Sequence, residues 1–330
     1  MVDAGKQLIN EVISEKLDME KLGIGPNCTT ITVADLGCSI GPNTFYAIQI
    51  IIEAIKLKHI TKSSESLNLE FQVYFNDNIS NDFNMLFRSL PPSREYYVVG
   101  VPNSFYERLF PKSSIHLMYS SASLHWLSGV PKEVKDPNSL AWNEERIYCA
   151  TEEVTKAYSC QFEKDMKSFL RTRAEELVSG GLMMLFTVVR QKDTAHSQTS
   201  SGKFYDILGS CLIKMANRGL ISKEKVNSFN LPIYNASTEE LKELIDEVNY
   251  FTIERMEEYS LGSIKMARDT QVVISHIRAA FEGLIRNHFG DEVIEELFED
   301  YTKAYAENLN TFQESSTKHN STFAIILKRI

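Results

Sequence analysis

The hydrophobic positions of this 330-residue chain follow two different spacings along the sequence. A β-branched run at residues 29–33 is followed by apolar side chains three or four positions apart, at Phe45, Ile48, Ile52 and Ile55. The run predicts a buried strand, and the spacing after it predicts an amphipathic helix. The first predicted unit is therefore a strand, a short loop and a helix.

Both patterns recur towards the C-terminus. Apolar or alternating runs predict further strands at residues 67–75, 115–119, 182–189, 251–258 and 322–328. Helical spacing predicts a long helix from Val154 to Leu177, stopped by Ser179-Gly180-Gly181, and mainly helical structure over residues 204–248, 272–289 and 293–309. Strands that alternate with helices favour a mostly parallel sheet with helices on both faces. We predict an α/β, Rossmann-like fold with a mainly helical cap.

The polar, turn-rich residues 191–203 predict a mobile loop and a boundary. We expect residues 1–190 to form a cofactor-binding core, completed by return strands near 251–258 and 322–328. Residues 191–321 are expected to form a mainly helical substrate-binding cap.

A glycine turn joins the first predicted strand to the first predicted helix. Asp35 stands two positions before Gly37, and Gly41 follows four positions later. This spacing differs from the Gly-x-Gly-x-x-Gly of dinucleotide folds, which disfavours a nicotinamide-dependent dehydrogenase. It suits S-adenosylmethionine, because glycine lets the backbone approach a ligand and Asp35 can accept from an ammonium group. The alternative is a turn whose glycines only relax the backbone.

Polar residues also follow two other predicted strands. Asp77 comes after the strand at 67–75 and can accept hydrogen bonds from a ribose diol, or it can serve as a helix N-cap or turn residue. The polar stretch 120–126 follows the strand at 115–119. Ligands of parallel sheets bind beyond the carboxyl ends of the strands, so we expect these clusters to meet at one site.

Composition narrows the choice of partners. Lys and Arg number 35 against 44 Asp and Glu, giving a net charge of −9, which disfavours binding to nucleic acids or anionic membranes. The five cysteines contain no Cys-x-x-Cys pair and predict free thiols in a reducing compartment. No apolar stretch approaches the ~20 residues that span a bilayer, and the N-terminus lacks the apolar core of a secretory signal. We expect a cytoplasmic protein, and leave open whether it forms a homodimer.

Several blocks of the chain match one enzyme family in order and spacing. The blocks are Ala34-Asp35-Leu36-Gly37-Cys38-Ser39, Gly41-Pro42-Asn43-Thr44, Phe75-Asn76-Asp77, Gly100-Val101-Pro102, Ser104-Phe105-Tyr106, Ser123-Leu124-His125-Trp126 and Ser228-Phe229-Asn230-Leu231-Pro232. In them the chain resembles the plant SABATH methyltransferases, which methylate salicylate, benzoate, jasmonate, iridoid acids and xanthine alkaloids. The iridoid-acid and salicylate-type carboxyl methyltransferases are most similar in these blocks.

The resemblance implies a role for individual residues. It implies that S-adenosylmethionine is bound by Asp35, Gly37, Cys38, Asn43, Asp77, Ser104 and Phe105. Within that set, Asp77 would hold the ribose, and Ser104 and Phe105 would border the adenine. His125 and Trp126 match the catalytic pair that meets the substrate carboxylate, although both can also simply pack in the core. Ala122, Tyr205 and Ile277 align with walls of the substrate pocket.

Some family members also bind magnesium. The matching positions here are Asn143, Asn227, Phe229 and Asn230, and the family usually has Asp in place of Asn227, which weakens the case for a metal. Two further departures concern the reaction centre. A segment that closes over the cofactor in the family is expected to be absent before Met1, and Ala122 replaces a Tyr beside the transferring methyl group.

The resemblance implies methyl transfer from S-adenosylmethionine to the carboxylate of a small plant acid. A carboxylate with a pKa near ~4 is ionised at neutral pH, so the reaction needs alignment rather than a general base. The indole N–H of Trp126 can fix one carboxylate oxygen. Two alternatives remain open: N-methylation of a xanthine-like heterocycle, and a degenerate member that binds small molecules without turnover.

Overall fold

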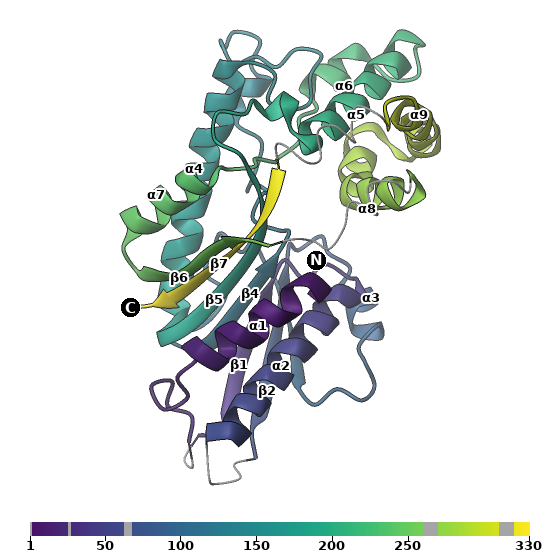
Figure 1. Ribbon diagram of the computed structural model, residues 1–330. Helices are drawn as coiled ribbons and strands as arrows, with labels where there is room; N and C mark the ends of the chain where they lie inside the picture. The colour runs from purple at the N-terminus through teal and green to yellow at the C-terminus, as the bar shows by residue number, and fades with distance from the viewer. Residues whose placement is uncertain (1, 26–27, 63–67, 260–269, 310–319) are drawn as a thin grey trace.

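A seven-stranded sheet organises the computed structural model, which describes residues 2–25, 28–62, 68–259, 270–309 and 320–330 (Figure 1). The strand order is β3-β2-β1-β4-β5-β7-β6. The strands are β1 (Thr30–Leu36), β2 (Glu70–Asp77), β3 (Tyr97–Pro102), β4 (Ile115–Ser121), β5 (Leu177–Arg190), β6 (Phe251–Glu258) and β7 (Asn320–Arg329). Strands β1 to β5 pair in parallel, whereas β7 runs antiparallel to both β5 and β6. This confirms the α/β, Rossmann-like prediction.

Helices cover both faces of the sheet, because parallel neighbours need a crossover between them (Figure 1). On one face α1 (Val2–Lys16) packs against α2 (Pro42–Lys62), and both contribute to one hydrophobic core with β1 and β2. On the other face α4 (Glu152–Glu176) packs against α7 (Thr238–Val248). The short α3 (Phe83–Arg88) follows β2.

A group of helices lies beyond the carboxyl ends of the parallel strands, at the top of Figure 1. Its members are α5 (Ser200–Asn217), α6 (Lys223–Ser228), α8 (Thr270–Phe289) and α9 (Ile294–Glu307), with the 3-10 turns η2 (His196–Gln198) and η4 (Asp291–Val293). Helix α5 packs against α9 and α6, and α9 packs against α8. A further 3-10 turn, η1 (Lys132–Lys135), precedes α4. These helices share the hydrophobic core of the α4 face, which places them firmly over the strand ends.

Two predicted boundaries are wrong. Helix α4 ends at Glu176, before the Ser-Gly-Gly stop signal, and β5 starts at once because the extended Leu177 buries its side chain to 1% exposure. The segment 191–203 is not a loop throughout, since it contains η2 and the start of α5. His196 and Thr199 are buried within it. Strand β3 was not predicted, although it contains three valines; it lies at the edge of the sheet and its residues are at most partly buried.

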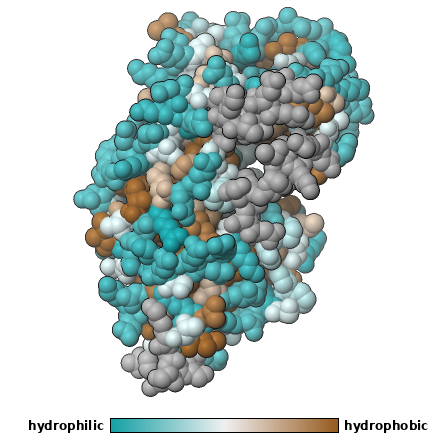
Figure 2. Space-filling model, viewed as in Figure 1, coloured by the Kyte–Doolittle hydropathy of each residue, from teal (hydrophilic) through white to brown (hydrophobic). Residues whose placement is uncertain are grey.

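The face of the molecule in Figure 2 is mainly hydrophilic, with hydrophobic residues in small groups between polar ones. Such scattered apolar residues are usual on protein surfaces. None of the helices in the described part of the chain is both long and apolar enough to cross a membrane.

Candidate cofactor and acceptor site

The turn after β1 is shaped by a glycine that no other residue can replace without strain. Gly37 has a φ of +83°, and the N–H groups of Gly37 and Cys38 donate to the carbonyl oxygen of Asn76 at 2.9 and 3.0 Å. A Cβ atom on Gly37 would lie 2.2 Å from Oγ of Ser123, which follows β4. Glycine is therefore needed both for its left-handed backbone and for the close approach of the β4 loop.

Asp35 is a carboxyl group buried at the end of β1. It is 2% exposed and accepts a hydrogen bond from the hydroxyl of Thr44 in the first turn of α2. The pKa of Asp35 is raised to about 7, mainly by burial; the Thr44 hydrogen bond lowers it in part, and the negative charge of Asp77 adds to the rise. A cation bound beside Asp35 would favour the ionised form, so this carboxyl is prepared for a positively charged group.

Asp77 ties the end of β2 to the turn after β1. Its Oδ2 accepts from the backbone N–H of Ser39 at 2.6 Å, and its Oδ1 accepts from that of Asn78 at 2.7 Å. Burial raises the pKa of Asp77 despite these two hydrogen bonds. Asp77 is not a helix N-cap, because Asp82 caps α3. The side chain is partly exposed at the strand end, where a ligand can reach it.

The loop after β3 also approaches the glycine turn. The ring of Phe105 lies 3.7 Å from the position that a Cβ of Gly37 would take. Its centroid is 4.7 Å from that of Tyr106 and 5.9 Å from that of Phe169, both in edge-to-face contact. Ser104 accepts from the N–H of Tyr106 at 3.3 Å. The structure therefore brings Phe105 to the glycine turn, with Ser104 next to it in the chain.

Two further residues of the implied cofactor set have contrasting surroundings. Asn43 is exposed at the start of α2. Cys38 is buried, and burial, followed by the charges of Asp35 and Asp77, raises the pKa of its thiol. The thiol is thus protonated at neutral pH and packs as a small apolar group rather than acting as a nucleophile.

The implied acceptor residues follow β4 on the far side of the glycine turn. Ala122 adopts a φ of +55° and donates its N–H to the carbonyl oxygen of Phe186 at 2.8 Å. Nδ1 of His125 is buried and has no hydrogen-bond partner among the described residues. Burial lowers the pKa of His125 to about 4, so the imidazole is neutral at physiological pH.

The cap helices reach this loop directly. The ring of Trp126 lies 5.7 Å from that of Phe281 on α8, and Phe281 is in edge-to-face contact with Tyr205 on α5 at 5.6 Å. Ile277 stands one turn before Phe281 and packs on the same core. Trp126, Phe281 and Tyr205 thus form one aromatic wall, with Ile277 packed on the same core.

The backbone of the acceptor loop is held by the segment before α7. The N–H of Tyr234 donates to the carbonyl oxygen of His125 at 2.9 Å, and the N–H of Leu127 donates to that of Pro232 at 2.8 Å. This ladder fixes the direction of the Trp126 side chain relative to the strand ends.

The residues implied as metal ligands come together, but as a hydrogen-bonded cluster. Nδ2 of Asn143 donates to Oδ1 of Asn230 at 2.6 Å and to the carbonyl oxygen of Tyr148 at 3.1 Å. Oδ1 of Asn227 accepts from the N–H of Glu145 at 3.2 Å. Within this cluster, Oδ1 of Asn143 and Nδ2 of Asn230 are buried without a hydrogen-bond partner among the described residues.

This donor set does not fit magnesium. Mg²⁺ in proteins is usually held through one or two carboxylates, whereas the implied side chains offer neutral amides, two of which already accept hydrogen bonds. Phe229 packs its ring against His288 and Phe289 at centroid distances of 5.2 and 5.1 Å. Over the described residues, no group of three His, Cys, Asp or Glu side chains is placed to hold a metal ion.

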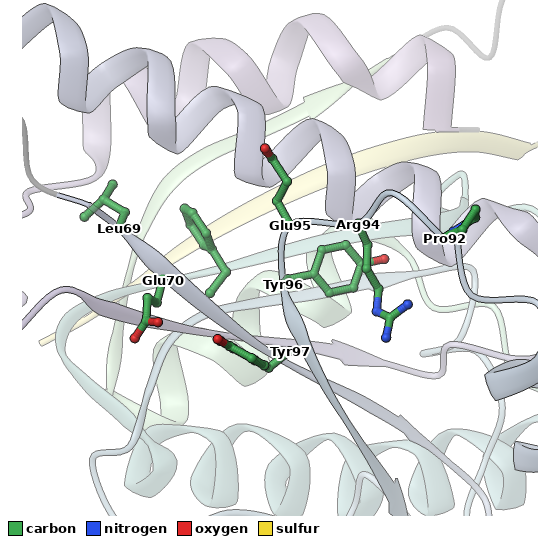
Figure 3. A pocket seen from close by; sticks show the side chains of 8 residues that line it. Leu69, Glu70, Pro92, Arg94, Glu95, Tyr96 and Tyr97 are labelled. Carbon is green, nitrogen blue, oxygen red and sulfur yellow. The ribbon is translucent and has the colours of Figure 1, made fainter.

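A separate hollow of about 420 Å³ lies away from these residues (Figure 3). Its lining includes Glu70 and Tyr97, the first residues of β2 and β3. It therefore sits at the amino ends of the parallel strands, opposite to the glycine turn and the acceptor loop.

Sequence reasoning missed four residues that shape the site. They are Thr44, Asn76, Ser123 and Phe281. The first three lie within the matched blocks, and Phe281 is four positions after Ile277 on the same predicted helix face. That spacing was the available signal for the aromatic wall.

A family profile described as SAM-dependent carboxyl methyltransferase matches residues 1–330. The chain belongs to this family. It is accordingly a methyltransferase that uses S-adenosylmethionine and acts on a carboxylate, and the SABATH resemblance is confirmed.

Individual carboxyl methyltransferases are similar over nearly the whole chain. Loganic acid O-methyltransferase of Catharanthus roseus is 43% identical over 332 residues, covering 100% of this chain and 88% of the relative. Farnesoic acid carboxyl-O-methyltransferase of Arabidopsis thaliana is 41% identical over 331 residues, covering 100% and 92%. The solved structure of loganic acid methyltransferase with SAH superposes with a TM-score of 0.93 at 42% identity, over 99% of this chain and 92% of that one.

Proposed function

We propose that this carboxyl methyltransferase holds its cofactor between the glycine turn and Asp77, and its acid substrate beside His125 and Trp126. One observation carries the proposal: the ends of β1, β2 and β4 converge under an aromatic wall from the cap helices. Convergence of this kind is where parallel sheets bind ligands.

On the cofactor side, each residue has a distinct role. Asp35 takes the ammonium group, because its buried carboxyl gains most from a neighbouring positive charge. Asp77 accepts from the ribose hydroxyls, and Ser104 and Phe105 border the adenine, with the ring of Phe105 held against the glycine turn. Asn43, Gly37 and Cys38 complete the turn around the amino-acid end.

On the acceptor side, the proposed donors are neutral. The pKa of His125, lowered to about 4, leaves its imidazole uncharged, and the indole N–H of Trp126 is a neutral donor. In methyl transfer the carboxylate oxygen forms a bond to the methyl carbon while the bond from that carbon to the sulfonium sulfur breaks, so the neutral ester and thioether replace both charges. A site that aligns the two groups with neutral donors, and excludes water, favours the less charged transition state over the separated ions.

The wall around the acceptor indicates the kind of acid. Tyr205, Ile277 and Phe281 present aromatic and aliphatic surface next to Trp126, and Ala122 adds only a methyl group. We propose a plant carboxylic acid that is apolar next to its carboxylate, in keeping with the farnesoic acid of one relative. N-methylation of a heterocycle is not proposed, because the loganic and farnesoic acid methyltransferases, at 43% and 41% identity, are more similar to this chain than paraxanthine methyltransferase 2 of Arabidopsis thaliana, at 37%.

Three further features complete the proposal. The substrate cap consists of α5, α6, α8 and α9. Magnesium takes no part, because the Asn143 and Asn230 amides are bound to each other. All five cysteines are free thiols, which supports our expectation of the cytoplasm.

The chemistry of the product provides the test. The chain is incubated with S-adenosylmethionine labelled in the methyl group, against a panel of plant acids and a xanthine. A methyl ester releases labelled methanol on mild alkaline treatment, whereas an N-methyl group does not. Alkali-labile label with an apolar acid supports the proposal, and alkali-stable label on the xanthine would contradict it.

A further inference from the structure

Helix α4 presents one polar stripe to the underside of the proposed site. Asp165, Ser168, Arg173 and Glu176 are spaced three, five and three positions apart, so they lie along a single side of the helix. All but Ser168 are buried below 7% exposure. Apart from contacts within α4, their partners lie in loops, which gives this stripe a specific task.

The C-terminal end of the stripe holds the loop after β3. Arg173 and Glu176 are wholly buried and joined by two hydrogen bonds, of 2.7 and 3.0 Å. The guanidinium also donates to the carbonyl oxygen of Phe105 at 2.6 Å and to that of Glu107 at 2.7 Å.

Glu176 completes this attachment from the other side. Its Oε1 accepts from the backbone N–H of Leu109 at 2.6 Å and of Phe110 at 3.1 Å. A buried ion pair is often no more stabilising than apolar residues of the same size, so the stability of the fold alone does not explain why Arg173 and Glu176 are paired here. What the pair supplies is four charge-assisted hydrogen bonds to a loop without regular secondary structure.

The middle of the stripe reaches the acceptor loop. Ser168 donates to the carbonyl oxygen of Tyr106 at 2.7 Å, and the Tyr106 hydroxyl donates to the carbonyl oxygen of Trp126 at 2.6 Å. Asp165 accepts from the N–H and hydroxyl of Ser128 at 2.8 and 2.7 Å. The same helix therefore holds Phe105 on one side and Trp126 on the other.

We propose that α4 sets the distance between the two reactants, with Arg173 as the positioning residue of the adenine-side loop and Tyr106 as that of Trp126. This inference rests on the proposed roles of Phe105 and Trp126. Neither positioning residue needs to touch a reacting atom. Each acts by fixing the backbone carbonyl oxygen of a residue that borders a reactant, Phe105 at the cofactor and Trp126 at the acid.

The two halves of the proposal predict different kinetic effects. Arg173→Lys keeps the charge, but a single ammonium cannot bind two carbonyl oxygens and Glu176 with the geometry of a guanidinium. We expect the Kd for S-adenosylhomocysteine to rise about tenfold, while the KM for the acid changes less than twofold. Tyr106→Phe should lower kcat/KM for the acid about tenfold through misalignment of Trp126, with the cofactor Kd unchanged.

Controls separate positioning from stability. Arg173→Met combined with Glu176→Gln avoids an unpaired buried charge, so it tests the loop attachment even if Arg173→Lys folds poorly. Arg171→Met, an exposed change on the same helix, is the matched control. Wild-type affinity for S-adenosylhomocysteine in the double variant overturns the proposal, as does a loss of cofactor and acid affinity together in both single variants. Failure of the wild-type chain to bind S-adenosylhomocysteine would instead count against the proposed site itself.

Discussion

Replacing Asp35 with Asn should separate the stability of the free enzyme from its affinity for the cofactor. The pKa of Asp35 is raised from 3.8 to about 7, and one pKa unit corresponds to about 1.4 kcal/mol. Because the folded value is the higher one, the contribution of this carboxyl to stability is complete below about pH 4. It is lost as the pH rises through 7.

The size of the effect follows from this shift. At pH 8 the folded chain bears nearly the whole cost of ionising a buried group, about 4 kcal/mol relative to a neutral side chain. At pH 5 the folded carboxyl is still protonated, and the cost is about 2 kcal/mol. Asn retains an oxygen that can accept from Thr44. The difference in the free energy of unfolding between Asp35→Asn and the wild type should therefore shift by about 2 kcal/mol in favour of the variant from pH 5 to pH 8. Urea unfolding without ligand measures this difference.

The same substitution should weaken cofactor binding. Loss of a charge-assisted hydrogen bond costs about 1.5–3 kcal/mol, so calorimetry should show at least a tenfold higher Kd for S-adenosylhomocysteine. Wild-type affinity should fall about tenfold for each pH unit below 7, because the ammonium group needs the ionised carboxyl. Asp246→Asn, an exposed change on α7, is the control. This account of Asp35 would be refuted if the free energy of unfolding changed with pH equally in Asp35→Asn and the wild type, and if the wild-type Kd for S-adenosylhomocysteine did not change with pH.

Further predictions concern the ribose, the acceptor, the metal and the pH profile. Asp77→Ala should weaken the binding free energy for S-adenosylhomocysteine by about 1.5–3 kcal/mol in calorimetry, and an affinity equal to that of the wild type would show that Asp77 is not part of the site. Trp126→Phe keeps the ring but not the donor, so methylation should slow with little change in Tm; a large fall in Tm at normal specific activity would show packing instead. Dialysis against a chelator should leave turnover unchanged. If dialysis instead lowered turnover and added magnesium restored it, the amide cluster would bind a metal. At saturating cofactor and acid, kcat should show no ascending limb at pH 6–7, because the acceptor is ionised and the pKa of His125 is about 4.

Local patterns predicted most of the sheet and its ligand-binding edge. The strand–glycine–helix unit became β1 and α2, and the polar residues after β1, β2 and β4 do meet. Both results depend on short-range signals: β-branched runs, a glycine whose φ must be positive, and the rule that parallel strands end at the same edge.

The boundaries that failed are places where long-range burial decides between competing local preferences. Leu177 enters β5 because its side chain is buried against the core, even though Gly180 and Gly181 lie further on. In the segment 191–203, burial of His196 produced a 3-10 turn where polarity predicted a loop. Such contacts join residues far apart in the chain and leave no local pattern.

Contiguous motifs and local spacing were enough to identify the family and to predict most of the strands and helices. The surroundings of the candidate site residues depend on the folded structure. Burial raises the pKa of Asp35 to about 7 and lowers that of His125 to about 4, α8 places Phe281 against Trp126, and α4 carries Arg173 beneath the loop of Phe105. Each effect depends on distances between residues that are far apart in sequence, since solvation, ring contacts and hydrogen bonds act through space rather than along the chain.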